Sequence, residues 1–215
     1  MIEKAKINNE ARSTDSRDGH RANLYRLLAD CYRYPVAELA DELALLQQEA
    51  SALANNLGAS AKALRGNFQQ PGGLNQLGIA YSKLFIGPRE LLAPPYGSVY
   101  MEANRQVMGN STLGVMARYV EAGLNPSQDN KEPPDHISTE MEFMYYLVFE
   151  HLRCREERFA DKQREFFLAC VYPWVPRFAT AISRSRTHPF YSSLATVTTD
   201  FIVSEAKLFN KTEGG

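Results

Sequence analysis

The chain has 215 residues, which is long enough for one domain with a substantial buried core. Its composition, with 44% hydrophobic and 23% charged residues, is that of an ordinary globular protein. The formal net charge of -1 gives no basic surface for a phosphate backbone, so we expect no nucleic acid among the partners.

The cysteines and the lack of long apolar segments indicate the compartment. Cys31, Cys154 and Cys170 form neither a disulfide framework nor a C-x-x-C pair. Residues 1–23 lack the apolar core of a signal peptide, no two arginines are adjacent, and no stretch is apolar enough to cross a bilayer. We therefore expect a cytoplasmic protein with reduced thiols and no membrane insertion.

In chain order, the sequence predicts a flexible N-terminal arm over 1–18 and a single helical domain over 19–215. Within that domain, apolar residues recur at three- and four-residue spacing in segments separated by glycine or proline. The first of these segments begins at His20, and the others span 39–58, 61–68, 74–86, 100–123, 137–152, 166–171 and 189–206. Gly58 is expected to end one of these helices. No period-two strand pattern interrupts them, which predicts an all-α fold of about nine to eleven helices.

The segment 137–152 is apolar on nearly every side, which is typical of a buried central helix. It nevertheless contains Glu140 and Glu142, and a buried carboxylate is costly unless it is paired. Either these carboxylates face solvent at a helix edge, or Glu140, one turn after His136, orients that imidazole.

Asp135 and His136 precede this helix, directly after two prolines. Asp135 is a good N-cap residue, whereas a protonated histidine opposes the helix dipole at this position. The alternative is a polar cluster at the mouth of a groove. There Glu132 and Asp135 hold a cationic ligand group and His136 donates a hydrogen bond or titrates near neutrality.

The second unusual segment is the loop Ala93-Pro-Pro-Tyr-Gly-Ser-Val-Tyr100. Two prolines stiffen its backbone, Gly97 permits a sharp bend, and Tyr96 and Tyr100 supply aromatic rings. It is either an aromatic shelf for an apolar peptide or a structural loop whose tyrosines plug the core.

Enzyme motifs are absent from the sequence, which contains no G-x-S-x-G, H-E-x-x-H, G-x-x-x-x-G-K or G-x-G-x-x-G. His136 and Glu140, at i and i+4, could be two metal ligands together with Glu132. A helical di-metal site, however, commonly uses paired E-x-x-H motifs, which this chain lacks. A metal-binding enzyme and a non-catalytic assembly scaffold therefore stay as alternative hypotheses, and no catalytic residue is assigned.

These segments resemble the signature of the TorD/DmsD family, cytoplasmic chaperones of molybdoenzymes that are related to the NarJ type. The residues that carry the resemblance are, in chain order, Leu84-Phe85-x-Gly87-Pro88, Pro94 to Tyr100, Glu132-Pro133-x-Asp135-His136-Ile137 and Glu140-x-x-Phe143-Met144. Family members often carry tryptophan where Tyr96 and Tyr100 stand, so this site is expected to be more polar.

The resemblance implies a compact helical bundle of the family type, with no cofactor of its own and no catalytic activity. It implies a protein that binds the twin-arginine signal peptide and apoprotein of a molybdopterin-dependent oxidoreductase and delays export until the cofactor is inserted. Cofactor-insertion machinery is a further candidate partner. The resemblance leaves open a monomer or a helix-swapped dimer, for which 125–134 is the natural hinge.

By motif position, the resemblance assigns nine residues to the signal-peptide site. Those of the peptide groove are Leu84, Phe85, Pro95, Tyr96 and Tyr100. Those of the acidic hinge motif are Glu132, Asp135 and His136, with Glu140 behind them. For these residues to form one site, the segments 94–100 and 132–140 must lie close together in space.

Overall fold

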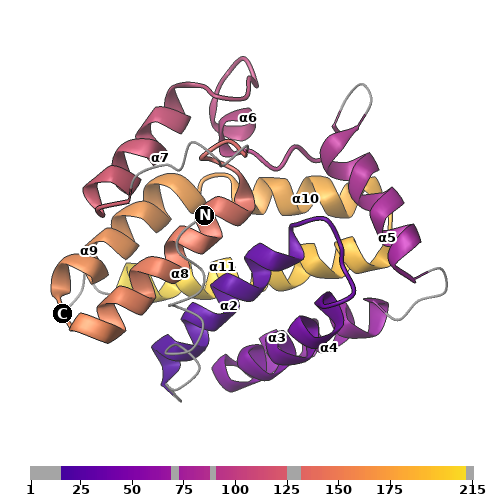
Figure 1. Cartoon of the computed structure of the whole chain (residues 1–215), viewed down its shortest axis with the longest axis horizontal. Coiled ribbons are helices and arrows are strands. Elements are labelled where there is room, and N and C mark those ends of the chain that lie inside the picture. Colours follow the sequence, from indigo (N-terminus) through magenta and orange to yellow (C-terminus); the bar gives the residue numbers. More distant parts are fainter. Residues whose placement is uncertain (1–15, 69–72, 88–90, 125–131, 212–215) are drawn as a thin grey trace. The chain divides into compact units, whose positions relative to one another are not determined.

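The computed structural model describes residues 16–68, 73–87, 91–124 and 132–211 (Figure 1). Within these ranges the chain forms ten α-helices, α2 to α11, and two short π-helical segments, η2 and η3. The described residues contain no strand, only an isolated β-bridge between Tyr96 and His136. The predicted all-α fold and its number of helices are confirmed.

The chain divides into two compact units, each built from two stretches of sequence. Unit 1 comprises residues 1–29 and 96–174, and unit 2 comprises residues 30–95 and 175–215. The helix α2 (Arg17–Cys31) contributes residues to both units. The sequence predicted a single domain over 19–215, and that boundary stays a prediction.

Unit 1 is organised around α8 (Ile137–Cys154), an 18-residue helix of which ten residues are buried. It lies beside α9 (Glu157–Phe166), which continues into η3 (Phe167–Val171) (Figure 1). The unit also contains two short helices, α6 (Gly97–Met101) and α7 (Asn110–Glu121). The prediction of a buried central helix is therefore confirmed.

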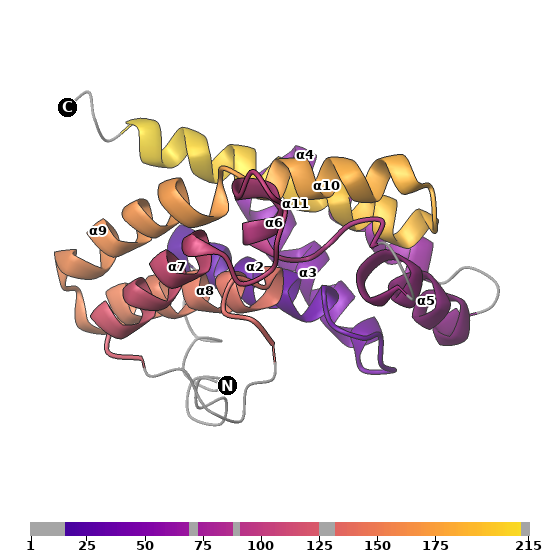
Figure 2. The ribbon, with the colours of Figure 1, turned by 90° about the horizontal axis from the view of Figure 1, so that it is seen from above.

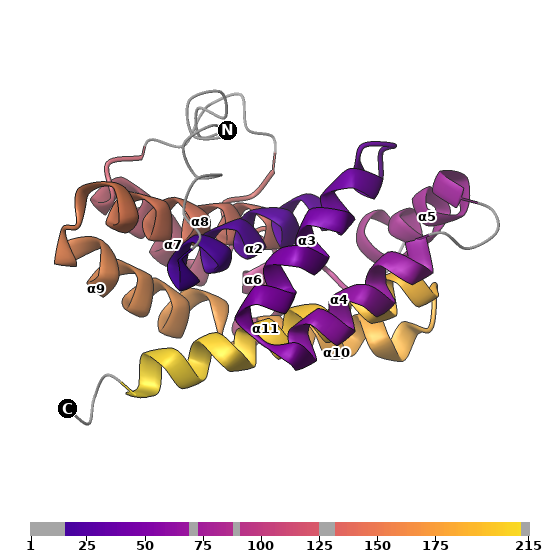
Figure 3. The same ribbon diagram turned by 90° about the horizontal axis from the view of Figure 1, so that it is seen from below.

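Unit 2 has α4 (Asn55–Phe68) packed against both α3 (Leu39–Leu53) and α11 (Pro189–Lys211), as Figure 3 shows. The helix α10 (Val175–Ser185) lies along α11 (Figure 2). The remaining helix, α5 (Gly73–Tyr81), continues directly into η2 (Ser82–Ile86) and ends at Gly87, as predicted.

Gly58 does not end a helix, contrary to the prediction. The break falls at Ala54, whose extended backbone separates α3 from α4, and Gly58 lies inside α4. A Cβ atom at Gly58 would be 2.5 Å from Ser51 Oγ and 3.0 Å from Ser51 Cα. The glycine therefore permits the close approach of two packed helices rather than a turn.

The predicted helix over 100–123 is two helices, α6 and α7, joined by an irregular segment. Arg105 and Met108 adopt positive φ values of 53° and 65° there, which interrupts the helix. On α7 the buried side chains are Thr112, Val115 and Tyr119. Leu113 and Val120, two apolar residues of the predicted helical segment 100–123, are 63% and 57% exposed.

The predicted N-terminal arm lies mostly outside the described residues, and α2 begins at Arg17, three residues before the predicted start. Most of the predicted hinge over 125–134 also lies outside them. Among the described residues, no single helix has the length and apolarity to cross a membrane. One bent pair of consecutive segments has sufficient length and apolarity only when its two members are combined, namely Glu157–Val171 and Val175–Ser185.

Candidate functional site

The two segments that the sequence singled out are in contact within unit 1. The start of α6 and the start of α8 are joined by the β-bridge between Tyr96 and His136. The amide N–H of Gly97 donates to the Asp135 carbonyl at 2.9 Å, and the amide N–H of Ser98 donates to Asp135 Oδ2 at 2.8 Å. The predicted proximity holds for residues 96–100 and 135–140.

His136, not Asp135, is the N-cap of α8. Its Nδ1 accepts a hydrogen bond from the amide N–H of Ser138 at 3.2 Å and lies 2.7 Å from the Ser138 hydroxyl. Only the protonated histidine ring opposes the helix dipole at this position. An unprotonated Nδ1 is an acceptor, like the side-chain oxygen of an ordinary N-cap residue.

Asp135 caps a different helix from the one it precedes. Its Oδ2 accepts from the first turn of α6, 37 residues away in sequence, and the side chain is only 1% exposed. The carboxylate therefore ties the loop before α8 to the start of α6. Asp135 Oδ1 is buried and has no hydrogen-bond partner among the described residues.

Gly97 allows α6 to approach two buried side chains of the site closely. A Cβ atom at this position would lie 3.1 Å from Trp174 Nε1 and 3.3 Å from Glu140 Oε1. Both distances are shorter than ordinary van der Waals contacts, so a larger residue would displace the indole or the carboxyl group.

Glu140 is bound to Trp174 rather than to His136. Trp174 Nε1 donates to Glu140 Oε2 at 2.9 Å, and both side chains are buried. Burial raises the pKa of Glu140 well above its ordinary value, the Trp174 hydrogen bond opposes this shift, and the negative charge of Asp135 adds to it. Glu140 Oε1 has no hydrogen-bond partner among the described residues. The predicted orientation of His136 by Glu140 is not observed.

The two tyrosines of the predicted groove have different environments. Tyr100 is 8% exposed and its ring stacks on Trp174 at a centroid distance of 5.7 Å, so it fills the core of unit 1. Tyr96 is half-buried and meets the His136 ring edge to face at 5.4 Å. Burial raises the pKa of Tyr96, and the charges of Glu132 and Asp135 add to this.

Glu132 is exposed, at the outer end of the loop that leads into α8. This loop is held to α7 by Tyr119, whose hydroxyl donates to the Pro134 carbonyl at 2.8 Å. Burial is the largest cause that raises the pKa of Tyr119, so the phenol stays protonated and remains a donor. The part of the cluster that solvent reaches therefore consists of Glu132 and one side of Tyr96.

The other three predicted groove residues lie in unit 2, where they are buried. Leu84 is 0% exposed, Phe85 is 4% exposed, and Pro95 is buried. The Phe85 ring contacts four aromatic rings of the same unit, those of Tyr32, Tyr81, Phe178 and Tyr191, at centroid distances of 5.0 to 6.3 Å. The structure thus places Leu84 and Phe85 in the core of unit 2.

Sequence reasoning missed Trp174, Ser98 and Tyr119, which complete the cluster in unit 1. A signal for Trp174 was available, because it is the only tryptophan in the chain and a buried indole N–H needs an acceptor. Ser98 contributes through its backbone amide and Tyr119 is one of 11 tyrosines, so the sequence offered no comparable signal for them.

The metal-binding alternative finds no support in this geometry. The described residues contain no group of three or more His, Cys, Asp or Glu side chains that could hold a metal ion. Glu140 Oε2 accepts from Trp174 and His136 Nδ1 accepts from Ser138, so these two atoms are occupied by protein donors.

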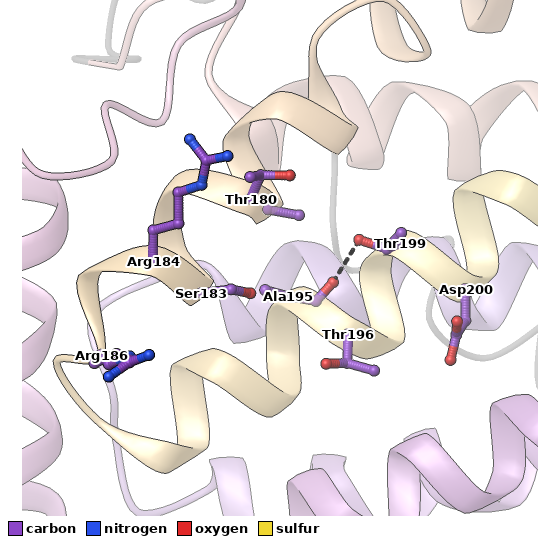
Figure 4. A pocket seen from close by; sticks show the side chains of 9 residues that line it. Thr180, Ser183, Arg184, Arg186, Ala195, Thr196, Thr199 and Asp200 are labelled. Atoms are coloured by element: carbon purple, nitrogen blue, oxygen red, sulfur yellow. Dashed lines mark hydrogen bonds between the residues drawn. The ribbon is translucent and has the colours of Figure 1, made fainter.

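Unit 2 has a separate hollow of about 410 Å³ along α10 and α11 (Figure 4). Seven of its nine lining residues are polar or charged, and the Thr199 hydroxyl donates to the Ala195 carbonyl at 2.8 Å. Arg184 and Arg186 flank it at the C-terminal end of α10, where the helix dipole disfavours an anion. None of the predicted site residues lines it.

Comparison with known proteins identifies the family. The model of the nitrate reductase delta subunit family matches residues 37–180, and the chain belongs to this family. The chain is 32% identical over 116 residues to the Tat proofreading chaperone DmsD of Salmonella typhi, covering 54% of this chain and 53% of that protein. It is 27% identical over 159 residues to the chaperone protein TorD of Salmonella schwarzengrund, covering 74% and 72%.

The chain thus spans about half the length of the DmsD relatives it matches. A solved structure from Archaeoglobus fulgidus, described as a redox enzyme maturation protein, is similar in fold, with a TM-score of 0.51 and 24% identity. That similarity covers 88% of this chain and 94% of the other. The resemblance inferred from the motifs is confirmed at the level of the family.

Proposed function

We propose that this protein is a cytoplasmic, non-catalytic chaperone for a molybdopterin-dependent oxidoreductase. It binds the twin-arginine signal peptide and the apoprotein and delays export until the cofactor is inserted. The observation that carries the proposal is the contact between the starts of α6 and α8, which joins the two motifs shared with the chaperone family in one acidic and aromatic cluster. The names of the DmsD and TorD relatives support the same function.

The chemistry of the cluster suits such a ligand. A signal peptide has a cationic region followed by an apolar region. Glu132 provides an exposed carboxylate for the cation, and Tyr96 provides a half-exposed ring beside it. Arginine binds both kinds of group, through charge-assisted hydrogen bonds and through stacking on an aromatic face.

The buried members of the cluster have a different proposed role. Asp135, His136 and Glu140 are at most 4% exposed, so they hold the backbone that presents Tyr96 and Glu132. Direct contact between Asp135 and a peptide cation would require the surrounding backbone to move, because the side chain is only 1% exposed and its Oδ2 accepts from Ser98 at the start of α6. Leu84, Phe85 and Pro95 shape unit 2 from within.

The test is a titration of the full chain with synthetic leader peptides that carry Arg-Arg followed by an apolar stretch, and with matched Lys-Lys peptides. We expect saturable binding with a preference for Arg-Arg. Glu132→Gln should weaken binding by up to about fivefold, because an exposed ion pair contributes up to about 1 kcal/mol. Tyr96→Ala should weaken it by about tenfold, as loss of an aromatic contact in an interface does.

Glu165→Gln is a control, because it removes an exposed carboxylate of unit 1, on α9, outside both the cluster and the helix α7. We expect it to leave the Arg-Arg preference unchanged. If no leader peptide binds saturably, the proposed function is wrong. If leaders bind and neither Tyr96→Ala nor Glu132→Gln changes the affinity, the chaperone function stands but the binding site lies elsewhere.

A further inference from the structure

The outer face of α7 carries an exposed apolar stripe, formed by Leu113, Met116, Ala117 and Val120, that the proposed site does not include. Leu113 is 63% exposed, Val120 is 57% exposed, Ala117 is exposed and Met116 is half-buried. These residues are three and four positions apart, so they follow one face of the helix over about two turns, or about 10 Å.

The inner face of α7 already packs within unit 1, so the stripe is an additional surface. Tyr119, Val115 and Thr112 are buried, and the Tyr119 ring lies 4.6 Å from the ring of Phe143 in α8. The segment before α7 adds further exposed apolar side chains, Met101 at 40%, Val107 at 42% and Met108 at 59%. Apolar exposure in unit 1 is therefore concentrated between residues 101 and 120.

The parts of this chain outside the described residues are poor candidates to cover the stripe. Residues 125–131, which follow α7, read Asn-Pro-Ser-Gln-Asp-Asn-Lys and contain no large apolar side chain. Residues 1–15 contain Ile2 and Ile7, which are five positions apart and so do not share a helical face. An apolar partner from another molecule fits the stripe better.

The charges next to the stripe indicate which kind of apolar partner fits. Among the described residues of 119–152, which contain no lysine or arginine, two acidic side chains are exposed, Glu121 and Glu132. Glu121 follows Val120 at the C-terminal end of α7, where the helix dipole also favours a cation. The Tyr119–Pro134 hydrogen bond holds the loop carrying Glu132 against this helix. Arg118, on the same helix, folds back and donates to the Gly114 carbonyl at 3.0 Å.

We propose that the outer face of α7 binds the apolar region of the client's leader peptide, with the cationic end of the peptide at Glu121 and Glu132. The inference rests on the proposed function and extends it, because it assigns the two parts of the leader to two neighbouring surfaces. The cluster at Tyr96 and Glu132 takes the cation, and the stripe takes the apolar region that follows it.

The test is a double-mutant cycle between the stripe and the apolar region of the peptide, measured by fluorescence anisotropy with a labelled Arg-Arg leader peptide. We expect Leu113→Ser with Val120→Ser to weaken binding at least tenfold, as loss of two apolar contacts in an interface does. A peptide whose apolar region is replaced by serine and glycine should bind the wild type and the variant equally weakly.

Val203→Ser is the matched control, because Val203 is 39% exposed on α11 in unit 2. Its affinity should stay within about twofold of the wild type, and circular dichroism should show all variants folded. Equal binding by the wild type and the stripe variant overturns this inference and leaves the proposed function intact. Absence of leader binding by the wild type overturns both. A wild-type dimer that the stripe variant dissociates, with leader affinity unchanged, identifies the stripe as a self-association surface and also overturns the inference.

Discussion

The carboxyl group of Glu140 is buried in unit 1, where one oxygen accepts from the indole of Trp174 and the other has no partner among the described residues. A buried carboxylate without a cation is expensive, which is why the pKa of Glu140 is raised. The raised pKa means that the folded protein binds this proton more tightly than the unfolded chain does.

Glu140→Gln should therefore remove a pH dependence of stability. In the wild type, both states are protonated at low pH, and above about pH 4.5 the unfolded chain loses the proton while the folded chain keeps it. The free energy of unfolding should thus fall as pH rises, by up to about 1.4 kcal/mol per pH unit, until the folded group also ionises. Urea unfolding at about pH 5 and about pH 8 measures this, because the variant should lack this contribution.

Trp174 supplies an independent readout of the same group, since it is the only tryptophan and donates directly to Glu140. Its fluorescence should change as Glu140 ionises in the folded wild type and should lack that change in Glu140→Gln. A wild-type protein whose stability has the same pH dependence as the variant would contradict the assignment of this proton to Glu140.

At the scale of elements, the packing of α3 against α4 depends on the absence of a side chain at Gly58. The backbone and side chain of Ser51 lie where a Cβ atom would be, and the Ser51 hydroxyl is held by the Gln47 carbonyl at 2.7 Å. Gly66 lies in the same helix, is exposed, and would have no atom within 4 Å of its Cβ. The two glycines thus form a natural pair for comparison.

Gly58→Ala should destabilise the protein by about 1–3 kcal/mol, as overpacking of a close helix contact does. Gly66→Ala should stabilise it by about 0.5–1 kcal/mol, because alanine is the better helix former and constrains the unfolded chain. Thermal and urea unfolding of both variants give the comparison. A gain of stability in both would show that the helices separate easily at Gly58.

Element boundaries also decide which surfaces are available. The apolar spacing from residue 100 to residue 123 predicted one continuous helix, but positive φ values at Arg105 and Met108 divide it. The helix α7 begins at Asn110, after this break, and its inner face is buried in unit 1. Leu113 and Val120 lie on the outer face, where they are exposed to solvent. Local spacing predicts a helix well, whereas which of its faces is buried depends on the partners it meets.

At the scale of the whole molecule, α2 is one continuous helix whose residues belong to both units. Leu24, Tyr25 and Leu28 of α2 are buried residues of unit 1, and Cys31, the last residue of α2, is a buried residue of unit 2. Burial raises the pKa of Cys31 well above its ordinary value, so this thiol is unreactive. A shared helix should couple the stability of the two units, because partial loss of α2 costs both of them buried apolar area.

We therefore expect one cooperative unfolding transition. Trp174 fluorescence reports on unit 1, whereas far-ultraviolet circular dichroism reports on the helices of both units. Their midpoints in urea should coincide, and Gly58→Ala in unit 2 should shift the Trp174 midpoint as well. Two separate midpoints, or a Trp174 transition unaffected by Gly58→Ala, would contradict the coupling.

The sequence by itself determined the helical class, the number of helices, the buried helix at 137–152 and the family resemblance. These follow from local periodicity and from motifs that are contiguous in the chain. It also pointed to the pair of segments at 96–100 and 135–140, which the structure brings together.

Only the tertiary structure decided the roles within that pair. In the structure, His136 caps α8, and the Asp135 carboxylate accepts from the first turn of α6. Glu140 accepts from Trp174, and Leu84 and Phe85 are buried in unit 2. Each of these roles depends on which donor, acceptor or ring a side chain meets from a distant part of the chain. Such partners lie 34 residues apart for Glu140 and Trp174, and 37 for Ser98 and Asp135, beyond the reach of any local pattern.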